Sequence, residues 1–475
     1  MRFTFQMTTA RRFLCVCVLF LAYHALLLAQ EPPAQPVTLN AAVDLALKNY
    51  PAIRASQARA AAARAGVEVA RTAYLPRLDF LWQENRATRN NIFGLLLPQP
   101  IIPSISGPVL GTKSYTSTWG SAGGSLLSWE LFDFGFRKAN VDVARATEEQ
   151  ANAGVEVTQL DVVTAAADVF LSVVASQETV RAVQANVDRL EVFGKSVHTL
   201  VDNQLRPGAD ASRADAELAA ARNQLILAQQ NAEISRITLA EALGLAGLPV
   251  NPEPGPLLDL PPVTSVPVFK FETHPLARAQ AAAVGIVRAR QRALARSYFP
   301  RFNFQSAYFG RGTGAKLNGQ IEGDEGLLPQ VPNWAAGLTV TFPAFEIFGI
   351  RARSRVEANN EAAEQARYEQ TIQSLQAQDA RVRALVDAAR RIAENTPIQL
   401  KAAQEAETRA RARYDAGLAA VTEVAEAQRL LAQAETDDAV ARLSVWRALL
   451  AAGKAQGDLQ PFLQQVATTP PTRRK

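Results

Sequence analysis

Four stretches of the chain alternate between apolar and polar residues, and this alternation predicts β-strands. Leu78, Phe80 and Trp82 share one side of an extended backbone, and Phe302 and Phe304 do the same later in the chain. A period of two that includes aromatic residues is typical of strands. We expect four strands, at about 77–86, 118–130, 301–309 and 333–342, the last with Trp334, Leu338 and Val340 on its apolar side.

The other side of these strands carries Thr, Gly, Asn and Gln rather than core residues. Such a pattern is typical of a membrane-barrel strand with lipid outside and water inside. It fits an ordinary half-buried hairpin equally well, and the alternation is poorer where Gly123 and Gly124 interrupt it. If the strands span a membrane, the lipid-facing side chains are Phe80, Trp82, Phe302, Phe304, Trp334, Leu338 and Val340.

A second pattern has a period of 3.5 residues and predicts very long helices. Fourteen positions from Val155 to Val201, separated alternately by four and three residues, carry eleven apolar side chains. A repeat sustained this far is a coiled-coil seam, and a helix over about 137–204 would be ~100 Å long. The counterpart helix is expected over about 351–415, where Pro397 should kink it. Its seam comprises Ile372, Leu375, Val382, Val386, Ala389 and Ala393.

Shorter helices are expected on both sides of these elements. Each long helix should turn at a glycine, Gly208 or Gly417, and return over about 211–243 or 419–453. Alanine-rich helical stretches at 39–74 and 272–298 precede the strands. Both stretches should stop before a proline, because proline disfavours the helical state of its predecessor.

The chain contains an internal duplication. A shift of 224 residues places Tyr74-Leu75-Pro76-Arg77-Leu78 on Tyr298-Phe299-Pro300-Arg301-Phe302, and Leu131–Gly135 then parallels Phe345–Gly349 with small gaps. We predict a duplicated unit of strands and long helices rather than a solenoid, whose repeats are shorter. The predicted parts are a first repeat at 31–244, a Pro-rich linker at 245–271, a second repeat at 272–455 and a partly disordered tail at 456–475.

Residues 1–30 have the pattern of a secretory signal peptide. Arg11 and Arg12 precede an apolar run, Phe13 to Leu28, and small residues follow near Ala29. A retained membrane anchor is the alternative, although 16 residues are short for a membrane span. We expect the mature chain to leave the cytoplasm.

The composition removes several classes of function. Both cysteines lie in residues 1–30, which excludes disulfides and Cys-based zinc sites from the rest of the chain. Beyond residue 30 there are 47 basic and 45 acidic side chains, a balance that argues against nucleic-acid binding. His198 and His274 have no nucleophile pattern nearby, and we expect both to be structural. We therefore predict no enzyme activity, no cofactor and no metal site.

No stretch after residue 30 has 18 uncharged apolar residues. The best candidate, Val162 to Val174, is interrupted by Asp168. A chain of this kind can cross a membrane only as a β-barrel, and the smallest such barrels have eight strands. Four strands are too few, so copies of the chain would have to share one barrel.

The chain resembles the TolC-type outer-membrane efflux proteins, the outer membrane factor family. The similarity covers residues 38–455 and lies in Thr38 to Pro51, Tyr74 to Leu78, Leu131 to Gly135 and Tyr414 to Leu418. The resemblance implies a homotrimer with a twelve-stranded barrel in the outer membrane and an α-helical tunnel in the periplasm. It implies the exit duct of a tripartite efflux or type I secretion system, a passive conduit opened by a periplasmic adaptor and an inner-membrane pump of RND or ABC type.

The resemblance also implies site residues. Acidic side chains beyond the second turn line the periplasmic entrance of family members, and Glu423 and Glu426 occupy those places. Their spacing of three puts both on one helix face, and three chains would form a ring that attracts cations. The implied adaptor-facing turn residues are Arg206, Gly208, Tyr414, Gly417 and Leu418, whereas Asp210 and Ala419 depart from the family's small-hydroxyl pattern. In the first copy, Asp215 and Glu217 do not align cleanly with the acidic pair.

A periplasmic coiled-coil adaptor or scaffold protein is the competing interpretation. It requires a water-soluble product, in which the alternating segments form a globular hairpin. No Met or His cluster favours a metal as the substrate.

Overall fold

The structure is a computed structural model that describes residues 36–88, 113, 115–262, 269–314 and 326–469. The predicted signal peptide at 1–30 lies outside the described residues. So do residues 470–475 of the predicted tail and parts of the linker and of the two long strand-to-strand loops.

The described chain is mostly helical and divides into two compact units. One unit comprises 1–53, 159–269 and 378–475, and the other comprises 54–158 and 270–377. The two longest helices, α4 (Phe136–Asp202) and α7 (Ile347–Asp415), contribute to both units. Each unit therefore contains parts of both predicted repeats.

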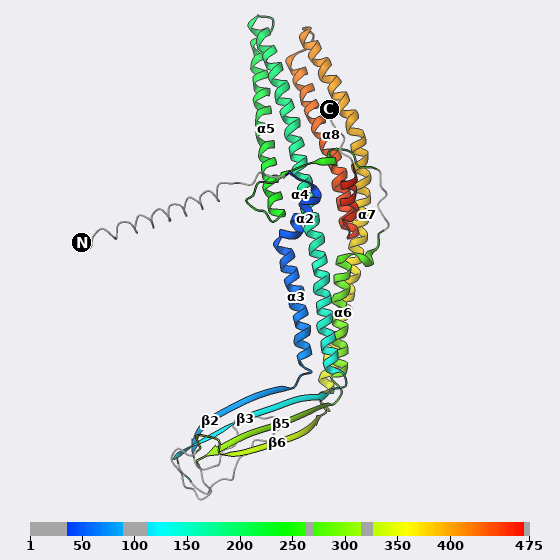
Figure 1. The fold of residues 1–475 in the computed structure, drawn as a ribbon. Coiled ribbons are helices and arrows are strands. Elements are labelled where there is room, and N and C mark those ends of the chain that lie inside the picture. Colours follow the sequence, from blue (N-terminus) through cyan, green and yellow to red (C-terminus); the bar gives the residue numbers. More distant parts are fainter. Residues whose placement is uncertain (1–35, 89–112, 114, 263–268, 315–325, 470–475) are drawn as a thin grey trace, which may run out of the picture. The chain divides into compact units, whose positions relative to one another are not determined.

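All four predicted strands are present and pair in a single antiparallel sheet. They are β2 (Arg77–Thr88), β3 (Ser117–Phe132), β5 (Arg301–Thr313) and β6 (Val331–Thr341), in the order β2-β3-β5-β6 (Figure 1). The inner pair β3 and β5 joins the first repeat to the second. The four strands are therefore one continuous sheet rather than two separate hairpins.

The register gathers the apolar residues of the sheet on one face. Phe80 is paired with Ser125, Ser125 with Tyr308 and Tyr308 with Trp334. Directly paired residues lie on the same side of a sheet, so the alternation of the separate strands adds up to one apolar face. The opposite face includes Asp79, Gln83, Asn85, Asn303, Gln305 and Thr339.

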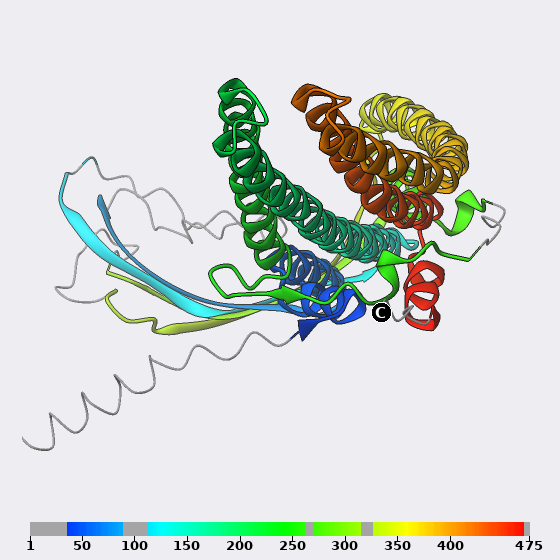
Figure 2. The same ribbon diagram turned by 90° about the horizontal axis from the view of Figure 1, so that it is seen from above.

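The glycines that interrupt the alternation of β3 allow close approach of neighbouring strands. A β-carbon on Gly124 would lie 2.3 Å from the backbone oxygen of Tyr308. One on Gly123 would lie 2.5 Å from the ring of Trp82, which covers that position. The sheet is strongly curved (Figure 2), and glycine kinks and aromatic cover are features of curved sheets.

The first helical stretch is broken, contrary to the prediction of one helix over 39–74. α2 (Leu39–Asn49) and α3 (Pro51–Thr72) are separated by Tyr50, whose ψ of 124° is extended. Proline restricts its predecessor at this position as it does before Pro76. The same restriction applies at His274, with ψ 129°, immediately before α6 (Pro275–Arg296).

Ion pairs connect the helices of the unit that contains the sheet. Arg64 on α3 contacts Glu148 on α4 at 3.1 Å, and Arg278 on α6 contacts Glu156 on α4 at 2.5 Å. Arg288 on α6 contacts Glu361 on α7 at 2.7 Å. These side chains are partly exposed, so each pair contributes little to stability.

The two strand-to-helix turns differ, although their sequences were expected to be parallel. After β3, Gly135 has a φ of 88° and α4 begins at Phe136. After β6, α7 already begins at Ile347, so Gly349 lies inside the helix rather than in a turn. The parallel between Leu131–Gly135 and Phe345–Gly349 in the sequence therefore does not extend to the local backbone.

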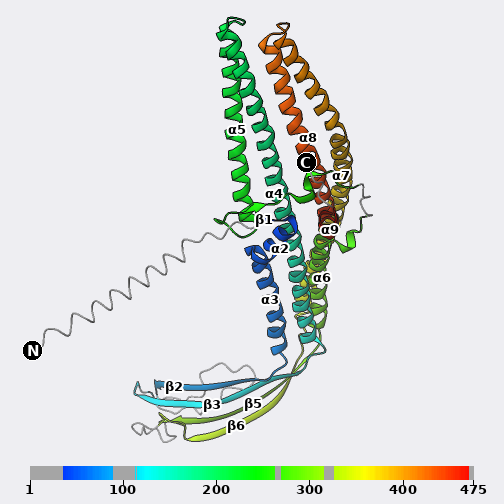
Figure 3. The same cartoon turned by 45° about the horizontal axis from the view of Figure 1, so that its top comes forward.

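The other unit contains two helical hairpins, α4 with α5 (Gly208–Ala242) and α7 with α8 (Val421–Gln456) (Figure 3). None of the 14 predicted seam positions from Val155 to Val201 is exposed. In α7 the predicted seam residues Leu375, Val382, Val386 and Ala393 are buried. α7 continues through Pro397 as one helix of 69 residues.

The core of this unit explains the most apolar part of α4. Among the described helices, α4 is long and apolar enough to cross a membrane by composition. Phe170, Val173 and Val174, however, are fully buried in a cluster that also contains Trp446 of α8. Packing against other helices therefore accounts for this apolar run.

The described parts of the linker and the tail contain short regular elements. β4 (Asn251–Pro252) pairs in parallel with β1 (Pro36–Val37), and η1 (Gly255–Leu258) is a short 3₁₀ helix with Leu257 in the core. A second short 3₁₀ helix, η2 (Phe271–Thr273), precedes α6. Within the tail, α9 (Gln460–Thr468) buries Phe462, whose ring meets Trp446 edge-on at 6.3 Å. Phe462 and Val466 are four residues apart and form an apolar helix face.

Candidate functional site

The two turns between paired helices have the same backbone geometry. Leu205 N–H donates to Leu200 C=O, and Leu418 N–H donates to Arg413 C=O, each at 2.8 Å. This bond between residues five apart ends a helix through a left-handed residue. That residue is Gly417 in the second turn, with φ 79°, and Gln204 in the first, with φ 59°.

This geometry corrects the prediction that the first helix turns at Gly208. Gly208 opens α5 instead, and Leu205 is the structural counterpart of Leu418. Both leucines are highly exposed, at 69% and 72%. Each turn therefore presents one apolar side chain to the surface of this chain.

Arg206 connects the two turns. Its guanidinium donates to the backbone oxygen of Tyr414 at 2.5 Å and lies over the Tyr414 ring, 4.4 Å from its centroid. Tyr414 is buried, with its ring against Phe193 at 5.4 Å. Burial, together with the nearby Asp210 carboxylate, raises the pKa of the Tyr414 hydroxyl. Tyr414 is thus a packing residue beneath the turns.

Glu423 and Glu426 lie in the first two turns of α8, and both are exposed. Glu423 pairs with Arg413 of α7 at 2.9 Å. Glu426 accepts two hydrogen bonds from Arg429, at 2.7 and 2.9 Å. The hydrogen bonds that Arg429 donates to Glu426 and the charge of Glu426, followed by the charge of Glu217, raise the pKa of Arg429. Each carboxylate therefore has an arginine of the same chain beside it.

The sequence did not reveal the partners of the acidic residues of the first repeat. His198 on α4 and Asp215 on α5 are 2.9 Å apart, although they are 17 residues apart in the chain. The hydrogen bond with Asp215 and its charge raise the pKa of His198. His274 is structural, as expected, because its Nδ1 accepts the Leu276 N–H at the start of α6. Among the described residues, no group of three or more His, Cys, Asp or Glu could hold a metal ion.

The seven predicted lipid-facing residues all lie on the apolar face of the sheet. Phe80 and Trp334 are 80% and 79% exposed, and Trp82, Leu338 and Val340 are also exposed. Phe302 and Phe304 are half-buried, since Phe302 meets the ring of Phe132 at 6.3 Å. This face therefore leaves large apolar side chains without cover in the single chain, which is unusual for a soluble monomer.

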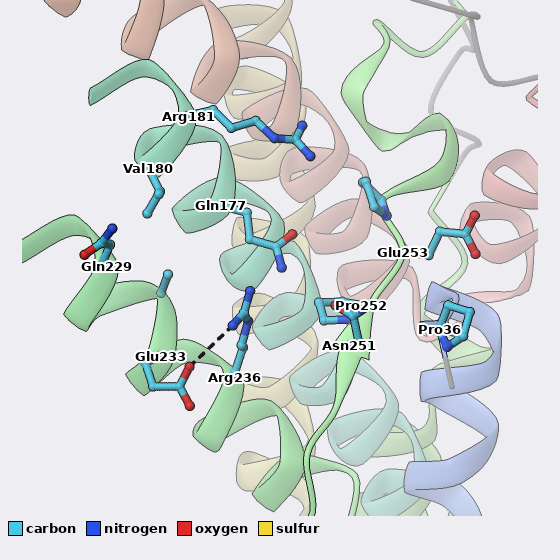
Figure 4. A pocket seen from close by; sticks show the side chains of 12 residues that line it. Pro36, Gln177, Val180, Arg181, Gln229, Glu233, Arg236, Asn251, Pro252 and Glu253 are labelled. Atoms are coloured by element: carbon cyan, nitrogen blue, oxygen red, sulfur yellow. Dashed lines mark hydrogen bonds and ion pairs between the residues drawn. The ribbon is translucent and has the colours of Figure 1, made fainter. Parts of the chain in front are cut away.

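Two grooves lie in the unit that contains the hairpins. Figure 4 shows one of about 630 Å³, between α4, α5 and the β1–β4 pair, with Arg181, Glu233, Arg236 and Glu253 in its wall. Arg236 pairs there with Glu233 at 3.4 Å. The mixed charges give this groove no evident preference for one sign of ligand.

The second groove, of about 500 Å³, lies between α4, α5 and α8. Gln428 and Asn186 line it and are buried. Within the described part of the chain, neither atom of the Gln428 amide group has a hydrogen-bond partner, and the same is true of Asn186 Oδ1. Buried amides of this kind reduce stability unless water reaches them.

Residues 42–245 and 272–457 match the family described as outer membrane efflux protein. The fold is similar to that of the outer-membrane channel OprN, with a TM-score of 0.70 and 21% identity over 88% of this chain and 89% of that one. The CmeC outer membrane channel of Campylobacter jejuni gives a TM-score of 0.69 at 15% identity, over 91% and 89% of the two chains.

The open state of the Neisseria gonorrhoeae MtrE outer membrane channel gives a TM-score of 0.66 at 19% identity, over 88% and 89%. No protein with a curated function matches the sequence. The matched segments include both turns and the residues from Arg413 to Arg429.

Proposed function

Because the chain belongs to the outer membrane efflux protein family, we propose that it forms the exit duct of a tripartite efflux or type I secretion system. It is an outer-membrane protein whose helical part lies in the periplasm. In the proposed role it is a passive conduit, with no chemistry of its own, and partner proteins open it.

The observation that carries this proposal is the open, one-sided sheet. Its apolar face includes exposed Phe80, Trp82 and Trp334, and among the described residues each end strand, β2 and β6, has a pairing partner on one side only. Unpaired strand edges in a lipid core are unfavourable, so the sheet must close with strands from elsewhere. Three copies would supply twelve strands, enough for a membrane barrel.

The helical turns are the proposed docking surface for a periplasmic adaptor. Leu205 and Leu418 are exposed at equivalent positions of the two turns, and Arg206 holds the turns together through the Tyr414 carbonyl. An adaptor that contacted both turns could change this link. We propose that it recruits an inner-membrane pump of RND or ABC type, as the family resemblance implies.

Glu423 and Glu426 are proposed to line the periplasmic entrance of the trimer. Both carboxylates are exposed and lie on one face of α8 near the second turn. A three-fold axis near this face would gather six carboxylates around the entrance. The sign of the electrostatic potential at the entrance then depends on which basic side chains lie beside these carboxylates.

The test is single-channel recording with the full chain purified in detergent. We expect a heat-sensitive trimer on unheated gels and discrete conductance steps in a planar bilayer. A water-soluble monomer that needs no detergent and gives no conductance would refute the channel. It would favour a periplasmic adaptor or scaffold instead.

A further inference from the structure

We infer that the periplasmic entrance of this channel is charge-compensated, because Arg413 and Arg429 offset Glu423 and Glu426. The channel would then admit anionic substrates as readily as cationic ones. This inference rests on the proposed function, and it concerns selectivity at the same site.

The geometry gives each entrance carboxylate its own cation. Arg413 Nη1 lies 2.9 Å from Glu423 Oε1 and reaches it from α7 across the turn. Arg429 lies one turn beyond Glu426 on α8 and contacts both of its oxygens. All four side chains are substantially exposed, between 42% and 75%. The two pairs therefore face solvent rather than the helix core.

A permeating ion responds to the sum of these charges. At physiological salt the screening length is about 8 Å, longer than the distance between the members of each pair. The field of each carboxylate is therefore largely offset by its arginine at the distance of an ion on the axis. Exposed ion pairs add little stability, so their hydrogen bonds can break. Each arginine still cancels the charge of its carboxylate when they do, because it stays close by.

The compensation comes from within one chain, so a trimer repeats it three times. Six carboxylates would stand beside six guanidiniums around the entrance. We therefore expect little preference for either sign of ion, whereas a bare ring of carboxylates would favour cations strongly.

The substrate class follows from this field. A bare acidic ring repels anions and binds multivalent cations at the constriction. A compensated ring does neither strongly, so anionic and zwitterionic molecules face no large barrier at the entrance. The pump and adaptor, rather than the duct, would then determine which of them are exported.

The experiment measures reversal potential in a KCl gradient across a planar bilayer, with the full-length trimer. For the wild type we expect a cation-to-anion permeability ratio close to one. Arg413→Gln with Arg429→Gln should raise this ratio on the order of tenfold and introduce block by a trivalent cation. Glu423→Gln with Glu426→Gln should invert the preference in favour of anions.

Two controls separate charge from structure. Arg413→Lys with Arg429→Lys keeps the charge and should keep the wild-type ratio. Arg391→Gln removes an arginine of similar exposure, paired with Asp387 elsewhere on α7, and should leave the ratio unchanged. Heat-sensitive trimers on unheated gels verify that each variant assembles.

Each outcome has one interpretation. A wild-type channel with strong cation selectivity would overturn the compensation. If the channel conducts but no substitution at these four positions changes its ion selectivity, the two ion pairs do not lie at the entrance. The proposal of a channel would then still stand. A water-soluble monomer that needs no detergent and gives no conductance would refute the proposed function itself.

Discussion

A buried ion pair holds the first strand-to-helix turn, and it can be tested by removing one charge. Asp133 and Arg137 are 7% and 9% exposed in their side chains, and Arg137 Nε lies 3.0 Å from Asp133 Oδ2. The same carboxylate accepts the backbone N–H groups of Arg137 and Gly135, at 2.6 and 3.0 Å. Arg137 also lies over the Tyr74 ring, 4.7 Å from its centroid. The pair therefore joins the end of α3, the turn and the start of α4.

Asp133→Asn should lower the free energy of unfolding by about 3 kcal/mol, because removal of one partner leaves the other charge buried without compensation. Asparagine keeps the shape of the side chain, but it is neutral and has only one acceptor oxygen. It therefore cannot replace all three hydrogen bonds that Asp133 accepts. Arg137 retains its contact with Tyr74 and a bond to the Ala73 carbonyl, which limits the loss.

The effect should depend on pH in a defined direction. Burial alone would raise the pKa of Asp133, but the hydrogen bonds from Arg137 and Gly135 and the Arg137 charge outweigh it and hold this pKa below its ordinary value. A carboxyl group with a lowered pKa contributes stability above its unfolded value, about 3.9, and loses it as the pH falls through the folded value. The wild type and Asp133→Asn should therefore converge in acid.

The assay is urea unfolding of the detergent-solubilised protein, followed by tryptophan fluorescence. Trp129 is a local reporter, since its indole N–H donates to the Tyr74 carbonyl at 3.0 Å. Asp142→Asn is the matched control, because Asp142 forms an exposed pair with Arg145 on the same helix. It should lower the unfolding free energy by less than about 1 kcal/mol. Equal losses for the two variants, or a loss for Asp133→Asn that does not change with pH, would refute the reasoning.

Three further changes follow from other local contacts. His198→Gln should abolish a gain in stability at acid pH. The raised pKa of His198 stabilises the folded state below about pH 6.5, and this stability is lost as the pH rises through the folded pKa. Urea unfolding midpoints of the wild type and the variant, on both sides of neutrality, measure the difference. Gln428→Leu should raise the unfolding free energy by about 1 kcal/mol by removing two buried, unpartnered amide atoms, and an unchanged thermal midpoint would contradict it. Gly124→Ala should reduce the yield of heat-sensitive trimers, because the added carbon would lie 2.3 Å from the Tyr308 carbonyl, whereas Gly337→Ala, with open space around it, should not.

The sequence predicted the elements whose pattern depends on the burial of one face. The 3.5-residue seam of α4 is buried or half-buried throughout, because a long helix between neighbours hides one stripe of its surface. The alternation of β2 and β6 likewise predicted their exposed apolar faces. These features repeat over many residues, so a single exception such as Gly123 changes little.

Features decided by one residue or by a contact across the chain were not predictable in this way. The break at Tyr50 depends only on the proline that follows it. The left-handed residue of the first turn is Gln204, although Gly208 lies nearby and has the stronger preference, because the position of the helix end determines where that conformation is needed. Arg413 and Glu423 are ten residues apart on two different helices, and only the turn between them brings their charges together.

The two repeats have the same hydrophobic periodicity but different charged contacts. Both repeats place a strand before a long helix, and the hydrophobic periodicity of that arrangement is common to them. The position equivalent to Asp133 is Ile347, however, so the second repeat cannot form the buried pair at its turn, and α7 begins there instead. A hydrophobic pattern tolerates such an exchange because it needs only apolar residues at intervals. An ion pair does not tolerate it, because its energy depends on one specific carboxylate at one position. The two repeats therefore share the same order of strands and helices, but their charged residues differ. The first repeat has the Asp133–Arg137 pair at its strand-to-helix turn, and the second has Glu423 and Glu426 after its helical turn.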